Sequence, residues 1–269
     1  MKSFRLLIIL LTGITVIVVA AFAWTLSRND DTTHTPADPV TTTMPTERTF
    51  PDLAPSAATR PPTTDLFGAR LEVPAEESGV ALNQEPGARL DPARPDYLTA
   101  SPARMQWQRG WGGAALPISG SDGPAQITNG VAQDFAHTPQ GAALAALDAL
   151  GRALSAPEGI WQQVVAERYY GGGPALVNRF ARSRARTPDA ARYVVVPDGV
   201  RVRPGYRDDL AVVEIAHRTT GGYTIATWPM AWVGGDWRVR VPEDIETLWG
   251  PGVSTPTLAE AFGSWKGQP

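Results

Sequence analysis

The stretch YTIATWPMAWVGGDWRVRV, residues 223–241, decides the fold class of this chain. Apolar residues recur at every second position in both halves, and Gly234-Gly235 lies between them. A period of two is typical of β-strands, and paired glycines between two such runs are typical of a hairpin turn. We therefore predict a long strand from Tyr223 to Val233 and a second strand from Asp236 to Val241.

The two predicted strands differ in how their faces are divided. On the second strand, the apolar positions Trp237, Val239 and Val241 alternate with the polar positions Asp236, Arg238 and Arg240. One face of that strand is therefore expected in the core and the other in water. Both faces of the longer strand are apolar, one carrying Trp228, Met230 and Trp232 and the other carrying Ile225, Ala231 and Val233. We expect this strand to be central in its sheet or covered on both sides.

Upstream of the hairpin, the sequence predicts three more strands. Tyr193 to Val196 and Val200 to Arg203 flank Pro197-Asp198-Gly199, which has the composition of a turn. Leu210 to Arg218 is the third, and Thr219 to Gly222 turns the chain into the hairpin. Short connections of this kind predict an antiparallel meander.

Three helices are predicted before the strands. Thr138-Pro139 combines an N-cap residue with proline at the first helical position, and the Ala/Leu-rich segment 140–154 follows. Residues 157–170 and 174–186 show helical spacing of their apolar positions, with Gly171-Gly172-Gly173 between them. Helices followed by an antiparallel sheet define an α+β domain.

Two segments carry a resemblance to known proteins. They are the hairpin Trp232-Val233-Gly234-Gly235-Asp236-Trp237-Arg238-Val239 and the helix start Phe135-Ala136-His137-Thr138-Pro139-Gln140-Gly141-Ala142-Ala143-Leu144. With the element order, they resemble the nuclear-transport-factor-two-like cone fold and an uncharacterised family of membrane-anchored actinobacterial proteins, over roughly residues 107–242. That family is often encoded on integrative conjugative elements, and inner-membrane assembly factors of conjugative secretion systems share the cone fold. The resemblance implies three helices packed in the mouth of a curved antiparallel sheet, in a protein of an envelope machine.

The N-terminus predicts a membrane anchor. Residues 6–26 form a run without a charge, and at 1.5 Å per residue a helix of that length spans about 30 Å, the thickness of a bilayer core. Lys2 and Arg5 precede the run, so residues 1–5 are expected to be a cytoplasmic tail and the rest of the chain to be exported. Ala21-Phe22-Ala23 fits a signal-peptidase pattern, which leaves cleavage as the alternative.

Composition separates a stalk from a domain. Residues 27–65 are rich in Pro and Thr and lack apolar periodicity, and residues 66–102 remain rich in Pro, so we predict an extended stalk over 27–102. Residues 66–102 also contain apolar pairs such as Leu71-Glu72-Val73, which leaves partial docking as an alternative for that part. Residues 103–265 form the predicted exported domain. The net charge of −3 excludes a generally basic chain, so no direct contact with nucleic acid is expected, and the absence of cysteine excludes disulfides and thiolate metal sites. We expect no metal and no cofactor.

No catalytic constellation emerges from the sequence, and we predict a protein that is not an enzyme. Ser119-Gly120-Ser121-Asp122-Gly123 resembles a nucleophile elbow but lacks the first glycine. A cone cavity, if present, would be lined by His217, Tyr193, Tyr206 and Trp161, and could hold a small apolar ligand. A cavity hydrolase or isomerase with His217 or an acidic residue as base is the remaining alternative.

Two surfaces are candidate interfaces. Trp228, Met230 and Trp232 form an aromatic face that would anchor a protein contact unless the C-terminal segment 248–265 covers it. Arg179, Arg182 and Arg186 share one face of a predicted helix and would attract an acidic partner or anionic headgroups. The expected partners are the bilayer through residues 6–26, other envelope proteins and a second copy of the chain. The expected function is that of a non-catalytic scaffold or assembly component, with conjugative DNA transfer as the candidate process.

Overall fold

The computed structural model describes residues 60–267 of the chain. The predicted cytoplasmic tail, membrane span and first part of the stalk lie outside the described residues. Within residues 60–267, no helix combines the length and apolar character needed to cross a bilayer. The described residues belong to one compact unit that begins at Thr59.

The larger sheet of this unit contains the predicted meander. Five strands lie side by side, all antiparallel except β7 with β11, and β12 pairs with the far end of β10. In spatial order they are β7 (Tyr169–Tyr170), β11 (Asp236–Arg240), β10 (Gly222–Val233), β9 (Leu210–Thr219) and β8 (Gly199–Val202), with β12 at Val253–Thr255. Trp232 pairs with Trp237 across the Gly234-Gly235 turn, so the predicted hairpin is confirmed. The long strand β10 is central, as its two apolar faces predict.

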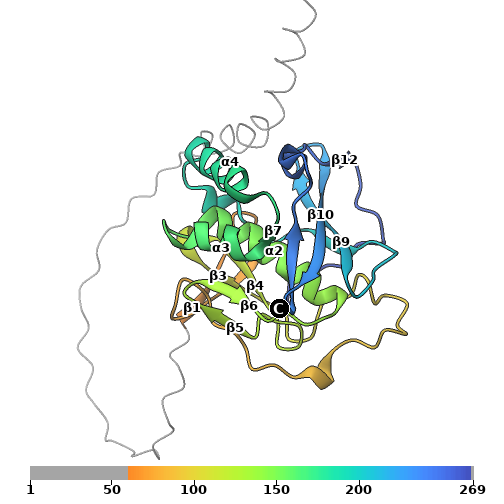
Figure 1. Ribbon diagram of the computed structural model, residues 1–269. Coiled ribbons are helices and arrows are strands. Elements are labelled where there is room, and N and C mark those ends of the chain that lie inside the picture. The colour runs from red at the N-terminus through yellow and green to blue at the C-terminus, as the bar shows by residue number, and fades with distance from the viewer. Residues whose placement is uncertain (1–59, 268–269) are drawn as a thin grey trace, which may run out of the picture. The chain divides into compact units, whose positions relative to one another are not determined.

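Three helices accompany this sheet (Figure 1). They are α2 (Pro139–Ser155), α3 (Ile160–Arg168) and α4 (Gly173–Arg186). The hydroxyl of Thr138 accepts a hydrogen bond from the Gly141 backbone N–H at 3.0 Å, which is the predicted N-cap. The α+β class with three helices is therefore confirmed.

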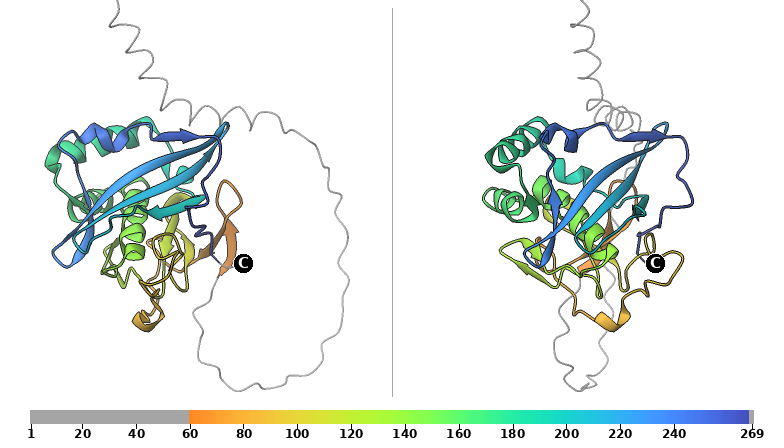
Figure 2. Two further views of the ribbon diagram at one scale, coloured as in Figure 1. Left: turned by 90° about the vertical axis from the view of Figure 1, so that its right-hand side faces the viewer. Right: turned by 45° about the vertical axis from the view of Figure 1, so that its right-hand side comes forward.

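A second, smaller sheet lies on the other side of α2 (Figure 1, Figure 2). Its strands are β1 (Arg60–Thr64), β2 (Arg70–Val73), β3 (Gln106–Arg109) and β4 (Ala115–Ile118), and β5 (Gln126–Thr128) forms a separate hairpin with β6 (Val131–Gln133). β2 and β3 are parallel, so both main sheets are mixed. Because α2 is covered on both sides, almost its whole length is buried.

The predicted boundary between stalk and domain, at residues 102–103, is wrong, because residues 60–102 are part of the folded unit. The segment is largely irregular, as its proline content suggests, but it is docked on the domain. Leu71 of β2 is buried, and the Gln108 side chain hydrogen-bonds both the N–H and the carbonyl of Val80 at 2.7 and 2.9 Å. The folded unit therefore starts near residue 60 and not at residue 103, because strand pairing holds the proline-rich chain in place.

Two further predictions are wrong in detail. Tyr193 to Val196 is not a strand, since Tyr193 ends the 3₁₀ helix η3 (Ala190–Tyr193) and irregular chain follows. Asp236 does not face water, because the Arg168 guanidinium pairs with it at 2.6 Å and both side chains are buried. Asp236 also accepts the backbone N–H groups of Asp134 and Phe135, so it ties the approach to α2 onto β11.

The C-terminal segment closes the domain by long-range contacts. Trp249, at the end of η4 (Ile245–Trp249), packs edge-on against Phe180 of α4 with ring centroids 4.9 Å apart. Gly263 forms a bridge with Val200 of the edge strand β8. Trp265 is buried and its carbonyl accepts the indole N–H of Trp107 on β3 at 2.6 Å. The segment thereby covers α4, one sheet edge and part of the smaller sheet.

Candidate interaction surface

The face of the larger sheet that is turned toward α2 is filled with side chains. Val213, Ile215, Met230 and Trp237 are at most 1% exposed on that face. From the helices, Leu144, Leu147 and Trp161 are buried in the same core cluster. Side chains thus occupy the region in which a cone-fold cavity would be expected.

The four predicted cavity residues lie apart. Trp161 is buried on α3, with the Arg184 guanidinium 5.2 Å from its ring centre, and Tyr193 is 38% exposed at the end of η3. Tyr206 precedes β9 and packs 6.0 Å from Trp237, whereas His217 lies near the other end of β9. Ten residues of strand span roughly 30 Å, so Tyr206 and His217 cannot share one small cavity.

Burial perturbs two of these groups separately. It lowers the pKa of His217, while the carboxylate of Asp198 opposes the shift. It also raises the pKa of Tyr206 above its usual value, and Tyr97 and Asp208 add to that rise. Because the two groups are at opposite ends of β9, they do not form an acid–base pair.

The predicted aromatic interface needs correction. Trp228 is 6% exposed and Met230 is fully buried, because that side of β10 faces the helices. Trp232, at the hairpin end of the strand, is half-buried and stacks in parallel on His137 with ring centroids 3.9 Å apart. The His137 ring also hydrogen-bonds the backbone carbonyl of Asp208. Trp232 alone of the three remains near the surface.

The three arginines of the predicted face of α4 differ in exposure, because one makes an internal contact and two are exposed. The Arg179 side chain is 8% exposed, its Nε lies 2.9 Å from both carboxylate oxygens of Glu246, and its guanidinium stacks 4.4 Å from the Trp249 ring centre. Arg179 therefore fastens the C-terminal segment to α4. Arg182 is 3.8 Å from Glu246 and half exposed, and Arg186 is exposed. Only the last two remain accessible to a partner.

The outer face of the larger sheet, turned away from the helices, is open only in part, because Glu214 and Ala216 on the same face of β9 are buried. Thr227 on β10 is exposed, and Ala231 and Val233 are half-buried. A cleft of about 250 Å³, here called the sheet cleft, lies at the hairpin end of this face. It is lined by Tyr170, Arg207, Asp209, Leu210, Ala231, Trp232 and Arg240.

Positive charge borders the sheet cleft. Arg240 is exposed and has no ion-pair partner among residues 60–267, and Arg207 lies 3.4 Å from Asp209 with both side chains largely exposed. Arg238 is directly opposite Ala231 in the β10–β11 register. Tyr170, 50% exposed, supplies an aromatic wall. Exposed aromatic and arginine side chains are the types enriched at the centres of protein interfaces.

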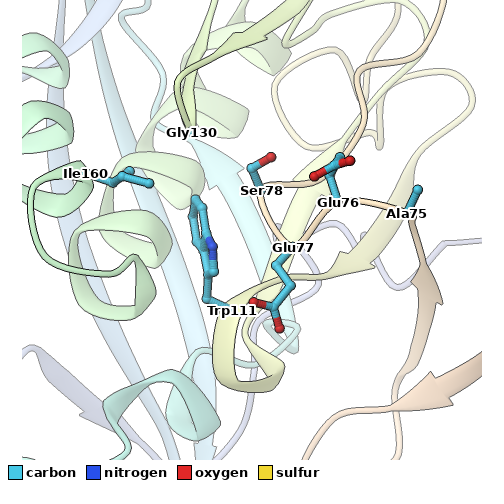
Figure 3. Close-up of a pocket in the computed structure, with 7 residues that line it drawn as sticks. All are labelled: Ala75, Glu76, Glu77, Ser78, Trp111, Gly130 and Ile160. Atoms are coloured by element: carbon cyan, nitrogen blue, oxygen red, sulfur yellow. The ribbon is translucent and has the colours of Figure 1, made fainter.

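A second cleft, of about 370 Å³, carries the opposite charge (Figure 3). This turn cleft is lined by Ala75, Glu76, Glu77, Ser78, Trp111, Gly130 and Ile160. Glu76 and Glu77 are exposed and have no ion-pair partner in the part of the chain that the structure describes. The Gly79 N–H donates to the Glu76 carbonyl at 2.9 Å, which closes the turn. No local sequence pattern predicts this cleft, because its walls come from four separate segments.

A buried ion pair of α2 holds two of the segments that line the turn cleft. Asp148 and Arg152 lie one turn apart in α2 with fully buried side chains, and Arg152 Nε donates to Asp148 Oδ1 at 2.7 Å. Arg152 Nη1 donates to the carbonyls of Ser78 and Gly130 at 2.8 and 2.9 Å. Burial raises the pKa of Asp148, and the Arg152 guanidinium opposes that rise. The only sequence signal was an acid and a base at i,i+4 inside an otherwise apolar helix.

The elbow-like serines are structural. Ser119 and Ser121 are fully buried, and their hydroxyls hydrogen-bond the Ala103 carbonyl, with Ser121 also bonded to Asp122 at 2.5 Å. The Asp122 carboxylate accepts the Thr138 hydroxyl at 2.6 Å. Across residues 60–267, no group of three or more His, Asp or Glu side chains could hold a metal ion.

One comparison with known proteins gives a result. A family model described as Domain of unknown function (DUF8175) matches residues 72–262. No curated protein and no solved structure is significantly similar to the chain. The match begins within β2, which agrees with the finding that part of the predicted stalk belongs to the folded unit.

Proposed function

The chain belongs to the DUF8175 family, and we propose that it acts as a non-catalytic assembly component of a cell-envelope machine. In this proposal residues 6–26 anchor it in the membrane by a single span, with residues 1–5 in the cytoplasm and the domain outside. We propose that this machine carries out conjugative DNA transfer, because segments 135–144 and 232–239 resemble a family that is often encoded on integrative conjugative elements.

The observation that carries the proposal is the contrast between the two faces of the larger sheet. Core side chains fill the inner face, which is where a cone-fold enzyme or carrier would hold its ligand. The outer face instead offers an open cleft with Tyr170 and two arginines. That combination supports contact with another macromolecule better than it supports chemistry on a small substrate.

We also propose that the helices and the larger sheet are a variant of the cone fold. Three helices precede the meander, and α2 packs against the inner side of the sheet. The smaller sheet and the docked segment 60–102 would then be additions that cover the outer side of α2.

Deletion of the gene, followed by conjugation and by crosslinking with copurification, tests the proposal. We expect reduced transfer and the recovery of envelope proteins with the tagged wild-type chain. Arg240→Glu should lower that recovery several-fold. Arg192→Glu is the matched control, because Arg192 is equally a surface arginine, placed on η3 away from the cleft.

Two outcomes would count against the proposal. Normal transfer by the deletion strain, with no envelope protein recovered by the wild-type chain, would overturn it. Loss of recovery in the Arg182→Glu and Arg186→Glu variant, with Arg240→Glu unaffected, would move the interface to α4.

A further inference from the structure

We propose that copies of this chain associate head to tail, with the Glu76–Glu77 turn of one copy seated in the sheet cleft of the next. The inference rests on the proposed assembly function and names one of its partners, a second copy. It starts from two clefts of opposite charge on one chain: paired carboxylates border the turn cleft, and Arg207 and Arg240 border the sheet cleft.

The acidic turn is exposed and is held in place by hydrogen bonds on both sides. Glu76 and Glu77 are exposed, and the turn is closed by the hydrogen bond from Gly79 N–H to the Glu76 carbonyl. On its far side, Ser78 is held by Arg152 and Val80 by Gln108. A turn that is already ordered loses little conformational entropy when it binds.

The sheet cleft has the chemistry to receive such a turn. Guanidinium groups bind carboxylates through paired, charge-assisted hydrogen bonds, and Arg240 has no competing carboxylate among residues 60–267. Tyr170, Leu210 and Ala231 provide apolar surface beneath the charges. Asp209 offsets part of the Arg207 charge, so Arg240 should contribute more to the contact than Arg207.

The placement of the two surfaces fixes the kind of assembly. The turn cleft is formed by the segment after β2, η2 (Trp111–Gly113), the β5–β6 turn and the start of α3. The sheet cleft is formed by β7, β10, β11 and the start of β9, on the face turned away from the helices. Because the surfaces are different, the contact is heterologous, and repeating it gives a ring or an open chain of copies instead of a closed dimer. Confinement to a membrane would raise the local concentration and permit a weak contact.

Charge reversal on the full chain in detergent tests the proposal. One variant carries Glu76→Arg and Glu77→Arg, and the other carries Arg207→Glu and Arg240→Glu. We expect the wild-type mass, measured by light scattering, to rise with concentration beyond that of a dimer, while each variant alone stays at its lowest mass. An equimolar mixture should regain association, because each reversed turn meets a reversed cleft and each native turn a native cleft. Association through residues 1–59 is common to all samples and cancels.

Cysteine crosslinking gives the register, since the natural chain has no cysteine. We expect a short bis-maleimide to join a copy carrying Ala75→Cys to a copy carrying Ala231→Cys, and to join neither variant to itself. Thr227→Cys is the control, because it is exposed on β10 and about 13 Å from position 231 along the strand.

The proposal fails if the wild-type mass is independent of concentration, if both charge variants associate like wild type, or if Thr227→Cys crosslinks as well as Ala231→Cys. If these self-association experiments fail while the wild-type chain still recovers envelope proteins, only the proposal of self-association is overturned. Failure of both measurements would remove the assembly function as well.

Discussion

Replacing Asp148 by leucine should destabilise the domain severely, because it leaves the Arg152 guanidinium buried without a counter-charge. Neither side chain of the pair is exposed, and the shortest contact, Nε to Oδ1, is 2.7 Å. Arg152 cannot move out to water without releasing the carbonyls of Ser78 and Gly130. The cost is therefore that of an uncompensated buried charge.

The magnitude follows from measured cases of broken buried pairs. Removing one partner costs about 3–5 kcal/mol. For a domain of this size each kcal/mol lowers the melting temperature by about 2–4 °C, so a fall of roughly 6–20 °C is expected. The double variant Asp148→Leu with Arg152→Met removes both charges, but it also leaves the Ser78 and Gly130 carbonyls without a donor at about 1–3 kcal/mol each. It should therefore stay well below wild type, at a cost similar to that of Asp148→Leu alone.

Urea unfolding of the full chain, followed by tryptophan fluorescence, measures these differences. Glu260→Leu is the matched control, since Glu260 is exposed and has no ion-pair partner within residues 60–267. Its free energy of unfolding should lie within about 0.5 kcal/mol of that of the wild-type chain. The reasoning is refuted if Asp148→Leu also stays within 1 kcal/mol of wild type, about the effect of an ordinary substitution, or if the double variant is as stable as wild type.

Three further substitutions have defined outcomes. Arg179→Met should lower the melting temperature by several degrees, because it removes a buried guanidinium that pairs with the half-exposed Glu246 and stacks on Trp249. Arg186→Met, on the exposed side of α4, should not, and equal melting curves would contradict this. Gly141→Ala, a change that usually stabilises a helix, should here destabilise by more than about 1 kcal/mol, because the new Cβ would stand 2.0 Å from the Ala136 carbonyl oxygen; wild-type stability would argue against that contact. Burial lowers the pKa of His217, so the unfolded chain binds the proton more readily and the free energy of unfolding should fall as the pH drops below about 6.5. The urea midpoint of His217→Gln should lack this part of the pH dependence. A variant with the same pH profile as wild type would exclude a contribution from His217.

The elements that the sequence predicted well are those with local signals. The β10–β11 hairpin follows from strict alternation around two glycines, and the Trp232–Trp237 pair lies where that register requires. The start of α2 follows from Thr138 and Pro139, which act within one helical turn of each other. The end of α3 was set two residues too late, because Tyr169 and Tyr170 leave the helix to pair with β11. That pairing depends on a strand nearly 70 residues further along the chain.

The candidate surfaces were harder to predict because alternation divides a strand into faces without saying which face meets the helices. Trp228 and Met230 were assigned to an interface, and the structure places them in the core. The open face is instead that of Ala231 and Val233, whose side chains are smaller and gave a weaker signal. The docking of segment 60–102 was predicted only as an alternative, and for part of its length, for a related reason. Its composition suits a solvated stalk, and only pairing with β3 reveals that Leu71 is buried.

Arginine side chains make many of the contacts that hold the irregular backbone in place, and composition alone did not predict those contacts. The chain has 22 arginines and only two lysines, Lys2 and Lys266. Irregular, proline-rich backbone leaves many carbonyls without a ladder partner, and a buried carbonyl must be given a donor. Guanidinium groups offer five donors in a fixed plane and stay charged when buried.

In this domain arginines fill that role at separate places. Arg152 and Arg184 each bind two backbone carbonyls, and Arg89 and Arg168 bind one each, at Ser121 and Trp237. These contacts join the loops and helix ends that no strand pairing reaches, in a chain with no cysteine to crosslink them. Of the 19 arginines within residues 60–267, 13 bind a backbone carbonyl or a carboxylate, and Arg240 is one of the six that do not. Among these six, Arg240 borders the sheet cleft, and this position is the reason to seek an external partner for it.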